Sequence, residues 1–145
     1  MSRALIVDAS VAFEGFVEEE GSDSARAVLQ APRRLIAPEL LLAEVANITW
    51  KVERRGEIRA KQPASMLAHL PDFFAEIVPM RHLMGPAQRL AMGLRHPVYD
   101  CLYLALAMDR DTTVVTADER FVALVRATSL AERVVLLGEA HRVLA

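Results

Sequence analysis

The chain is poor in the features on which secreted and membrane-spanning proteins depend. It has 145 residues and one cysteine, Cys101, so no disulfide can form within it. No stretch reaches the roughly 18 uninterrupted apolar residues that suggest a transmembrane helix. The first residues turn acidic at Asp8, too early for a secretory signal peptide. We therefore expect no membrane association and a location in the reducing cytoplasm.

Lysine is also scarce, because Lys51 and Lys61 are the only two in the chain. The formal net charge is −2, which excludes a protein that holds nucleic acid by bulk positive charge. The other basic residues are arginines, which suit bidentate contacts to phosphate or carboxylate, although the codon usage of a GC-rich genome explains the same bias. The densest basic group is Arg54, Arg55 and Arg59, a site that could guide nucleic acid or a solvated helix end.

Short apolar runs rich in branched residues alternate with longer segments of helical spacing. The pattern predicts strands at 4–7, 35–37, 73–78, 113–116 and 134–137, and helices at 11–19, 22–30, 39–55, 58–70, 86–94, 96–108 and 119–126, with a short helical tail from 138. This alternation is typical of an α/β fold with a mainly parallel central sheet of about five strands and helices on both faces. No linker or repeat interrupts it, so we expect one domain over residues 1–145.

The segment 96–108 stands out because it is apolar almost all the way round after Asp100. A helix without a polar stripe is buried inside a domain. Asp100 lies in its first turn, where it is either a partner of the helix dipole or a charge held at the edge of the core for chemistry.

Three further acids share this setting of apolar neighbours. Asp8 and Asp118 directly follow expected strands, whose carboxyl ends form the ligand-binding edge of open α/β sheets, and Glu44 lies in an apolar helix. Each has an ordinary explanation: Asp8 and Asp118 as helix caps, Glu44 as a solvent-facing residue. Buried together, however, the four acids would be costly without a partner, and no lysine is near them in sequence. A hard divalent cation, Mg²⁺ or Mn²⁺, resolves this conflict.

Four segments give the chain a family resemblance. They are Ile6–Val11, Ala37–Asn47, Tyr99–Ala107 and Val115–Phe121. Together they resemble the PIN-domain ribonucleases, and most of all the VapC toxins of bacterial and archaeal toxin–antitoxin pairs. The segments occur in the order of that family and span nearly the whole chain.

The resemblance implies a single PIN-like domain that acts as a metal-dependent endoribonuclease, the toxin of a type II toxin–antitoxin pair. RNA phosphodiester bonds would be hydrolysed by a metal-activated water. The implied catalytic residues and metal ligands, for Mg²⁺ or Mn²⁺, are Asp8, Glu44, Asp100 and Asp118. The residues expected to support them are Ser10, Asn47 and Thr116. Ser10 has an alternative role as the cap of the helix at 11–19, and Thr116 as an ordinary strand residue.

The resemblance also implies protein partners, namely a cognate antitoxin and a second copy of the chain in a homodimer. The antitoxin's C-terminal segment would lie in an apolar groove formed by the early helices. The candidate groove residues are Phe13, Phe16, Leu41, Leu42 and Trp50. A place in the core is the other interpretation of Trp50.

The four histidines are dispersed, without the spacing of metal ligands, and we expect them on the surface or in loops. His96 is the one that could approach a substrate phosphate. The main alternative function is a non-catalytic PIN-like scaffold that binds RNA or protein. A receiver-like domain would need a lysine after the last strand, and a phosphatase of the haloacid dehalogenase type would need an acid at Ser10.

Overall fold

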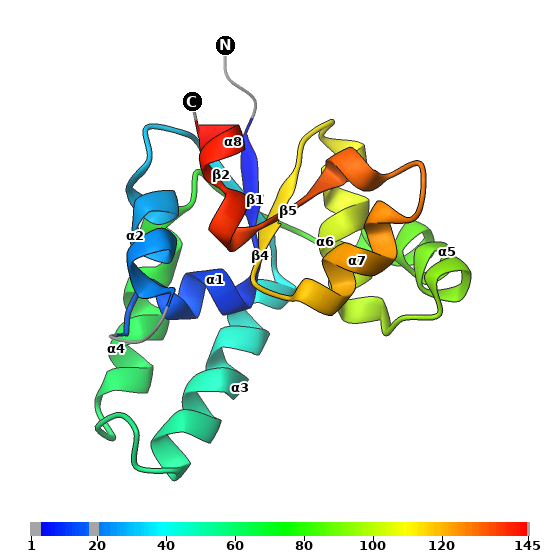
Figure 1. Ribbon diagram of the computed structural model, residues 1–145. Helices are drawn as coiled ribbons and strands as arrows, with labels where there is room; N and C mark the ends of the chain where they lie inside the picture. The colour runs from blue at the N-terminus through cyan, green and yellow to red at the C-terminus, as the bar shows by residue number, and fades with distance from the viewer. Residues whose placement is uncertain (1–3, 18–20, 145) are drawn as a thin grey trace.

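Figure 1 shows the computed structural model, which describes residues 4–17 and 21–144. Within these ranges, five parallel strands form one sheet in the order β3-β2-β1-β4-β5. The strands are β1 (Leu5–Val7), β2 (Leu35–Pro38), β3 (Glu76–Val78), β4 (Val114–Thr116) and β5 (Val134–Leu136). The predicted α/β class and parallel sheet are therefore confirmed.

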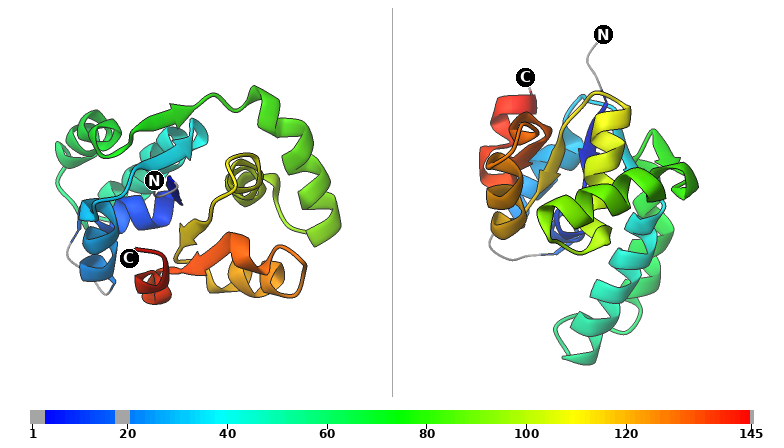
Figure 2. Two further views of the ribbon diagram at one scale, coloured as in Figure 1. Left: turned by 90° about the horizontal axis from the view of Figure 1, so that it is seen from above. Right: turned by 90° about the vertical axis from the view of Figure 1, so that its right-hand side faces the viewer.

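Helices cover both faces of this sheet, as expected (Figures 1 and 2). Their bounds are α1 (Ala9–Glu14), α2 (Ser22–Gln30), α3 (Leu40–Arg54), α4 (Gln62–His69), α5 (Met84–Leu94), α6 (Val98–Asp109), α7 (Glu119–Arg126) and α8 (His141–Leu144). Helices α1 and α2 lie on one face, and α5, α6 and α7 lie on the other. No described helix has the length and apolar character needed to cross a membrane.

The central position of β1, with both faces covered, explains why its sequence is apolar without interruption. Successive side chains of a strand point to opposite faces, so Leu5 and Val7 pack in the cluster that includes α1 and α2, while Ile6 packs against α6. All three are at most 1% exposed. A strand with both faces covered needs apolar residues at every position.

Helix α6 is the buried element that the sequence predicted. Every residue from Cys101 to Ala107 is buried, and burial of each large aliphatic side chain contributes about 1.5–3 kcal/mol. Exposure returns at the carboxyl end with Met108, which is 44% exposed. This packing on all sides fixes the position of the helix, and with it the position of Asp100 in the first turn.

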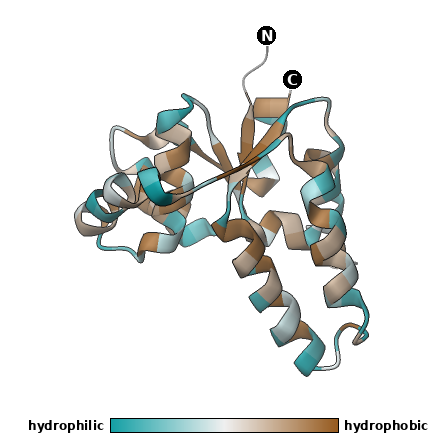
Figure 3. Cartoon of the chain, turned by 180° about the vertical axis from the view of Figure 1, so that it is seen from behind, coloured by the Kyte–Doolittle hydropathy of each residue, from teal (hydrophilic) through white to brown (hydrophobic). Residues whose placement is uncertain are grey.

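Helices α3 and α4 extend beyond the carboxyl end of the sheet as an antiparallel pair (Figure 1). Phe13, Val52 and Met66 form a small apolar cluster that joins α1, α3 and α4. In Figure 3 the part of α3 next to the sheet is mainly hydrophobic and its far end is hydrophilic. Arg54 and Arg55 are exposed at that far end, which matches the interpretation of the basic group as a solvated helix end.

Several element boundaries differ from those predicted. Helix α1 starts at Ala9 and ends at Glu14, and residues 18 and 19 of the predicted helix lie outside the described residues. Helix α4 begins at Gln62 because Pro63 occupies its first turn, where a proline's missing N–H costs nothing, instead of interrupting a longer helix. Strand β3 starts only at Glu76, since the preceding segment forms a 3₁₀ turn at Leu70–Phe73.

Candidate active site

The sheet reverses its strand order between β1 and β4. Strand β1 pairs with β2 on one side and with β4 on the other, with Ile6 opposite both Ile36 and Val114. Such a switch point opens a crevice at the carboxyl ends of the two strands, where ligands bind in open α/β folds. Asp8 follows β1 and Asp118 follows β4 closely, so both acids flank this crevice.

A cavity of about 140 Å³ lies at this place and brings the four predicted acids together. Its lining consists of Asp8, Ala9, Ser10, Glu44, Ile48, Asp100 and Asp118. Within the described part of the chain, no lysine or arginine contributes to the lining. The convergence that sequence order alone leaves open is therefore present in the fold.

Asp8 is the most deeply buried of the four acids, with 8% of its surface exposed. Its Oδ1 accepts hydrogen bonds from the Ser10 hydroxyl at 2.7 Å and from the Val11 backbone N–H at 3.2 Å. Its Oδ2 accepts a hydrogen bond from the Thr116 hydroxyl. Burial raises the pKa of Asp8 to about 6 although these hydrogen bonds act to lower it, and the charge of Asp100 raises it slightly further.

The capping interpretation of both strand-end aspartates is correct. Asp8 is the N-cap of α1, so the alternative role of Ser10 as that cap is wrong, and the Ser10 hydroxyl instead supports Asp8. Asp118 caps α7 by accepting the Phe121 N–H at 3.0 Å. Thr116 connects the two acids, because its hydroxyl donates to Asp8 and accepts the Asp118 N–H at 3.1 Å. Capping and a place in the cavity wall are thus compatible.

Glu44 projects from α3 into the cavity and is half-buried, not freely solvated. The Tyr103 hydroxyl on α6 donates to Glu44 Oε1 at 2.6 Å. Burial raises the pKa of Glu44 against this hydrogen bond, and the charges of Asp100 and Asp8 raise it further. The pKa of Tyr103 is also raised well above its usual value, mainly by burial and then by the nearby Glu44 charge. These mutual effects indicate three carboxylates close enough to repel.

Asp100 has an unexpected partner. The His96 Nε2–H donates to Asp100 Oδ2 at 2.6 Å, and the His96 side chain is only 12% exposed. Its ring packs on Phe121 with 5.0 Å between ring centroids. His96 lies in the bend before α6, as expected of a loop residue, but its side chain is largely buried against the site. A signal was available, because His96 lies two residues before the start of α6 and four before Asp100 in its first turn.

Tyr103 was not among the predicted site residues, although its spacing of three from Asp100 places both on one side of α6. Asn47, which was predicted to support the acids, is exposed on α3 and does not belong to the cavity lining. Asn47 lies about one helical turn after Glu44, but the helix directs its side chain toward solvent instead of the cavity.

The predicted partner groove is only partly exposed. Phe13 and Phe16 line a separate cavity of about 400 Å³ between α1, α3 and α4, together with Val52 and Ile58. Leu41 is fully buried, so its assignment to a surface groove is wrong, and Leu42 is half-buried.

Trp50 is 52% exposed on α3, so the interpretation as a core residue is wrong. The Arg54 guanidinium lies 5.4 Å from the centroid of its ring, a cation–π contact. The side chain is therefore available on the surface of the α3–α4 pair.

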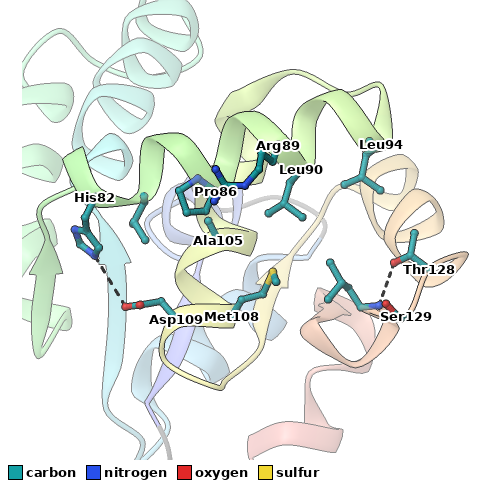
Figure 4. Close-up of a pocket in the computed structure, with 13 residues that line it drawn as sticks. His82, Pro86, Arg89, Leu90, Leu94, Ala105, Met108, Asp109, Thr128 and Ser129 are labelled. Carbon is teal, nitrogen blue, oxygen red and sulfur yellow. Dashed lines mark hydrogen bonds and ion pairs between the residues drawn. The ribbon is translucent and has the colours of Figure 1, made fainter.

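A larger cavity of about 560 Å³ lies elsewhere, between α5, α6 and residues 128–130 (Figure 4). Its lining is mainly apolar, including Leu90, Leu94 and Met108, and His82 and Asp109 form an ion pair of 4.0 Å at its rim. None of the four predicted acids contributes to it. The candidate chemistry therefore belongs to the smaller cavity.

The donor set of the small cavity fits a hard divalent cation. Carboxylate oxygens are the ligands that Mg²⁺ and Mn²⁺ prefer, and no described lysine or arginine lines the cavity to pair with them. As the side chains stand, no three His, Cys, Asp or Glu residues in the described ranges have the spacing of one ion's ligands. The fit to a cation therefore rests on the chemistry of the oxygen donors that line the cavity.

Comparison with known proteins agrees with this geometry. The family model for the PIN domain matches residues 5–127. Ribonuclease VapC3 of Pyrobaculum aerophilum is 35% identical over 127 residues, which cover 83% of this chain and 97% of that protein.

Two solved structures share the fold. The crystal structure of PAE2754 from Pyrobaculum aerophilum has a TM-score of 0.71 at 20% identity, covering 95% of this chain and 92% of that one. A toxin–antitoxin complex from Klebsiella pneumoniae has a TM-score of 0.62 at 12% identity, covering 92% of this chain and 98% of that one. The match to the family model and the similarity to VapC3 together show that the chain belongs to the PIN domain family.

Proposed function

We propose that this protein is a metal-dependent endoribonuclease and the toxin of a type II toxin–antitoxin pair. The observation that carries the proposal is the cavity at the β1–β4 switch point, whose wall contains Asp8, Glu44, Asp100 and Asp118 and no described lysine or arginine. The similarity to a protein named ribonuclease VapC3 supports RNA as the substrate.

In this proposal the four acids are the catalytic residues and hold Mg²⁺ or Mn²⁺. The bound ion would neutralise charge on the scissile phosphate and acidify a bound water. The Ser10 and Thr116 hydroxyls hold both oxygens of Asp8, so this carboxylate cannot rotate away from the cavity.

No covalent enzyme intermediate is part of this chemistry. Cys101 follows Asp100 directly but is buried, and burial together with the Asp100 charge raises the pKa of its thiol to about 11. A thiol with this pKa is almost entirely protonated at neutral pH and is not a nucleophile. Hydrolysis by water is the reaction that the site supports.

The cognate antitoxin would bind at the apolar cavity between α1, α3 and α4, with Phe13 and Phe16 in its wall. Trp50 and the half-buried Leu42 extend the apolar surface of α3. A homodimer acting in the cytoplasm completes the proposal, on the strength of the family resemblance.

The test of the enzyme is cleavage of a panel of RNAs by the metal-stripped protein, with and without added Mg²⁺ or Mn²⁺. We expect cleavage that requires the ion, stops with EDTA and disappears in Asp8→Asn. The products should carry 5′-phosphate and 3′-hydroxyl ends. Lack of turnover on every RNA, with no heat of divalent-ion binding in calorimetry, would instead favour the non-catalytic scaffold.

The toxin role needs a separate test. Induced expression of the wild-type chain in a bacterial host should arrest growth, and the Asp8→Asn chain should not. Co-expression of a cognate antitoxin, sought as a short reading frame next to the gene, should restore growth. Growth arrest by the Asp8→Asn chain would show that toxicity does not depend on the acidic site.

A further inference from the structure

We propose that Tyr103 and His96 are positioning residues. Each lies outside the cavity lining and holds one acid by a hydrogen bond, Tyr103 holding Glu44 and His96 holding Asp100, so that both carboxylates are oriented for one cation. This inference rests on the proposed function, because it concerns the same acidic cavity. In the described structure neither Tyr103 nor His96 belongs to the cavity lining, so each acts through the acid that it contacts.

The contact of Tyr103 is short and enclosed. The residue is 1% exposed, and its hydroxyl donates to Glu44 Oε1 at 2.6 Å across 59 residues of sequence. A buried phenol hydroxyl needs a hydrogen-bonding partner, since leaving it unpaired costs about 1–3 kcal/mol. The tight packing of α6 fixes the phenol ring, so the phenol in turn fixes one oxygen of Glu44.

Glu44 needs such a restraint more than the other acids do. It lies at the end of a long side chain on α3, whereas Asp8 is short and accepts three hydrogen bonds. Without the Tyr103 hydroxyl, Glu44 could rotate toward solvent, where its charge is better hydrated. Mutual repulsion with Asp100 and Asp8 would favour that rotation.

His96 restrains Asp100 in a comparable way from the other side. It precedes α6, and its Nε2 contacts Asp100 Oδ2 at 2.6 Å. Its ring packs on Phe121, which is 2% exposed and whose own N–H holds Asp118 at 3.0 Å. Phe121 therefore contacts both the histidine that holds Asp100 and Asp118 itself, so the positions of the two acids relative to each other are fixed.

Residues that orient metal ligands from behind change metal affinity or activity by about 10- to 100-fold when they are replaced. We expect a loss in this range for Tyr103→Phe, which removes only the hydroxyl, and for His96→Ala. His96→Gln keeps an N–H donor and should recover part of the loss. A merely structural role of the phenol or the imidazole would lower stability without moving metal affinity.

The experiment measures the dissociation constant of Mn²⁺ by calorimetry on the full-length metal-stripped protein, together with kcat and KM for a cleaved RNA. Matched controls are Tyr99→Phe, a tyrosine that is 58% exposed on the same helix, and His82→Ala, which removes a surface histidine–aspartate pair. Thermal unfolding shows that each variant folds. We expect weaker Mn²⁺ binding and lower kcat in Tyr103→Phe and His96→Ala, with little change in KM or in the controls.

The outcomes separate this inference from the proposed function. If Tyr103→Phe and His96→Ala fold and bind Mn²⁺ as tightly as the wild type, the inference is wrong, even if RNA is cleaved. If Mn²⁺ binding weakens in both but the wild type cleaves no RNA, the positioning role stands and the nuclease proposal fails. A wild-type chain that binds no Mn²⁺ overturns both.

Discussion

The two ends of the sheet treat acidic side chains in opposite ways. At the amino end, Glu76 receives two hydrogen bonds of 2.9 Å from Arg110, and Asp111 receives one of 2.8 Å from Arg133. At the carboxyl end, the acids of the cavity receive bonds from hydroxyl, phenol, imidazole and backbone groups, and no described arginine lines the cavity. The same fold thus neutralises its acids at one end and leaves them negative at the other.

The pKa values express this difference within a single residue type. The hydrogen bonds from Arg110 lower the pKa of Glu76, whereas burial raises the pKa of Glu44. Arginines pair with acids elsewhere in the chain, so the lack of a described arginine in the cavity lining distinguishes the cavity from the other end of the sheet. Acids that pair with arginine serve the fold, and acids that lack such a partner remain available to an added cation.

The largest expected effect comes from removing one charge at the carboxyl end. Asp100→Asn should lower RNA cleavage by more than about 100-fold. Replacing a residue that only orients a metal ligand already lowers metal affinity or activity by about 10- to 100-fold, and Asp100 is proposed as a ligand itself. The metal-free variant should be as stable as the wild type or more so, since repulsion among the acids is relieved. Cleavage assays and urea unfolding in EDTA measure the two effects. An Asp100→Asn chain that fails to fold would make Asp100 a structural residue.

A second effect should appear in the pH dependence of stability of the metal-free protein. Burial raises the pKa of Asp8 in the folded state to about 6, from an ordinary value of 3.8. Folded protein therefore binds a proton more tightly than unfolded chain, and stability falls as pH rises from about 4 to about 6. A shift of this size corresponds to about 3 kcal/mol, and the raised pKa of Glu44 acts in the same direction.

This pH effect is measured as the difference between wild type and Asp8→Asn, because other groups titrate in the same range. Urea unfolding in EDTA at a series of pH values gives the unfolding free energy of each protein. The difference between the two should shift in favour of Asp8→Asn as pH rises from about 4 to about 6 and stay constant above that. Parallel stability curves for the two proteins would show that Asp8 is not a buried, proton-binding carboxyl.

The smallest effect is expected at the amino end. Glu76→Gln removes the ion pair with Arg110. The Glu76 side chain is 38% exposed and the Arg110 side chain 36%. Surface ion pairs contribute about 0–1 kcal/mol, so the unfolding free energy should change little. Mn²⁺ binding and RNA cleavage should stay as in the wild type. Weaker Mn²⁺ binding in Glu76→Gln would show that the acids at the amino end also contribute to cation binding, so the two ends would not differ as described.

The place of Asp8 and Asp118 could be predicted from sequence because it depends on a general rule. Each acid follows an apolar strand, and the carboxyl ends of neighbouring parallel strands meet at one edge. Glu44 and Asp100 lie on helices, whose orientation no strand rule gives, and they were assigned with the help of the family resemblance. The order of strands and helices was likewise readable from hydrophobic periodicity.

The supporting contacts could not be predicted in the same way. Tyr103 meets Glu44 only because the fold brings a side chain of α6 and a side chain of α3 together, 59 residues apart in sequence, and the neighbours of neither residue encode this contact. Sequence alone also could not tell that Leu41 is buried and Trp50 exposed. Both are apolar residues of α3, but the helix extends beyond the sheet, so one end is covered by the core and the other is not.

The strand order also sets when the site can exist. Asp118 reaches the cavity only after β4 has been made and has paired with β1, the first strand of the chain. Synthesis proceeds from the amino terminus, so a growing chain holds Asp8, Glu44 and Asp100 before it can complete the cavity. The residues around Phe13 and Phe16 that form the α1–α3–α4 cavity all lie before residue 63. The surface proposed for the antitoxin therefore leaves the ribosome before the last acid, so under the proposed function an antitoxin could bind the new chain before its acidic site is complete.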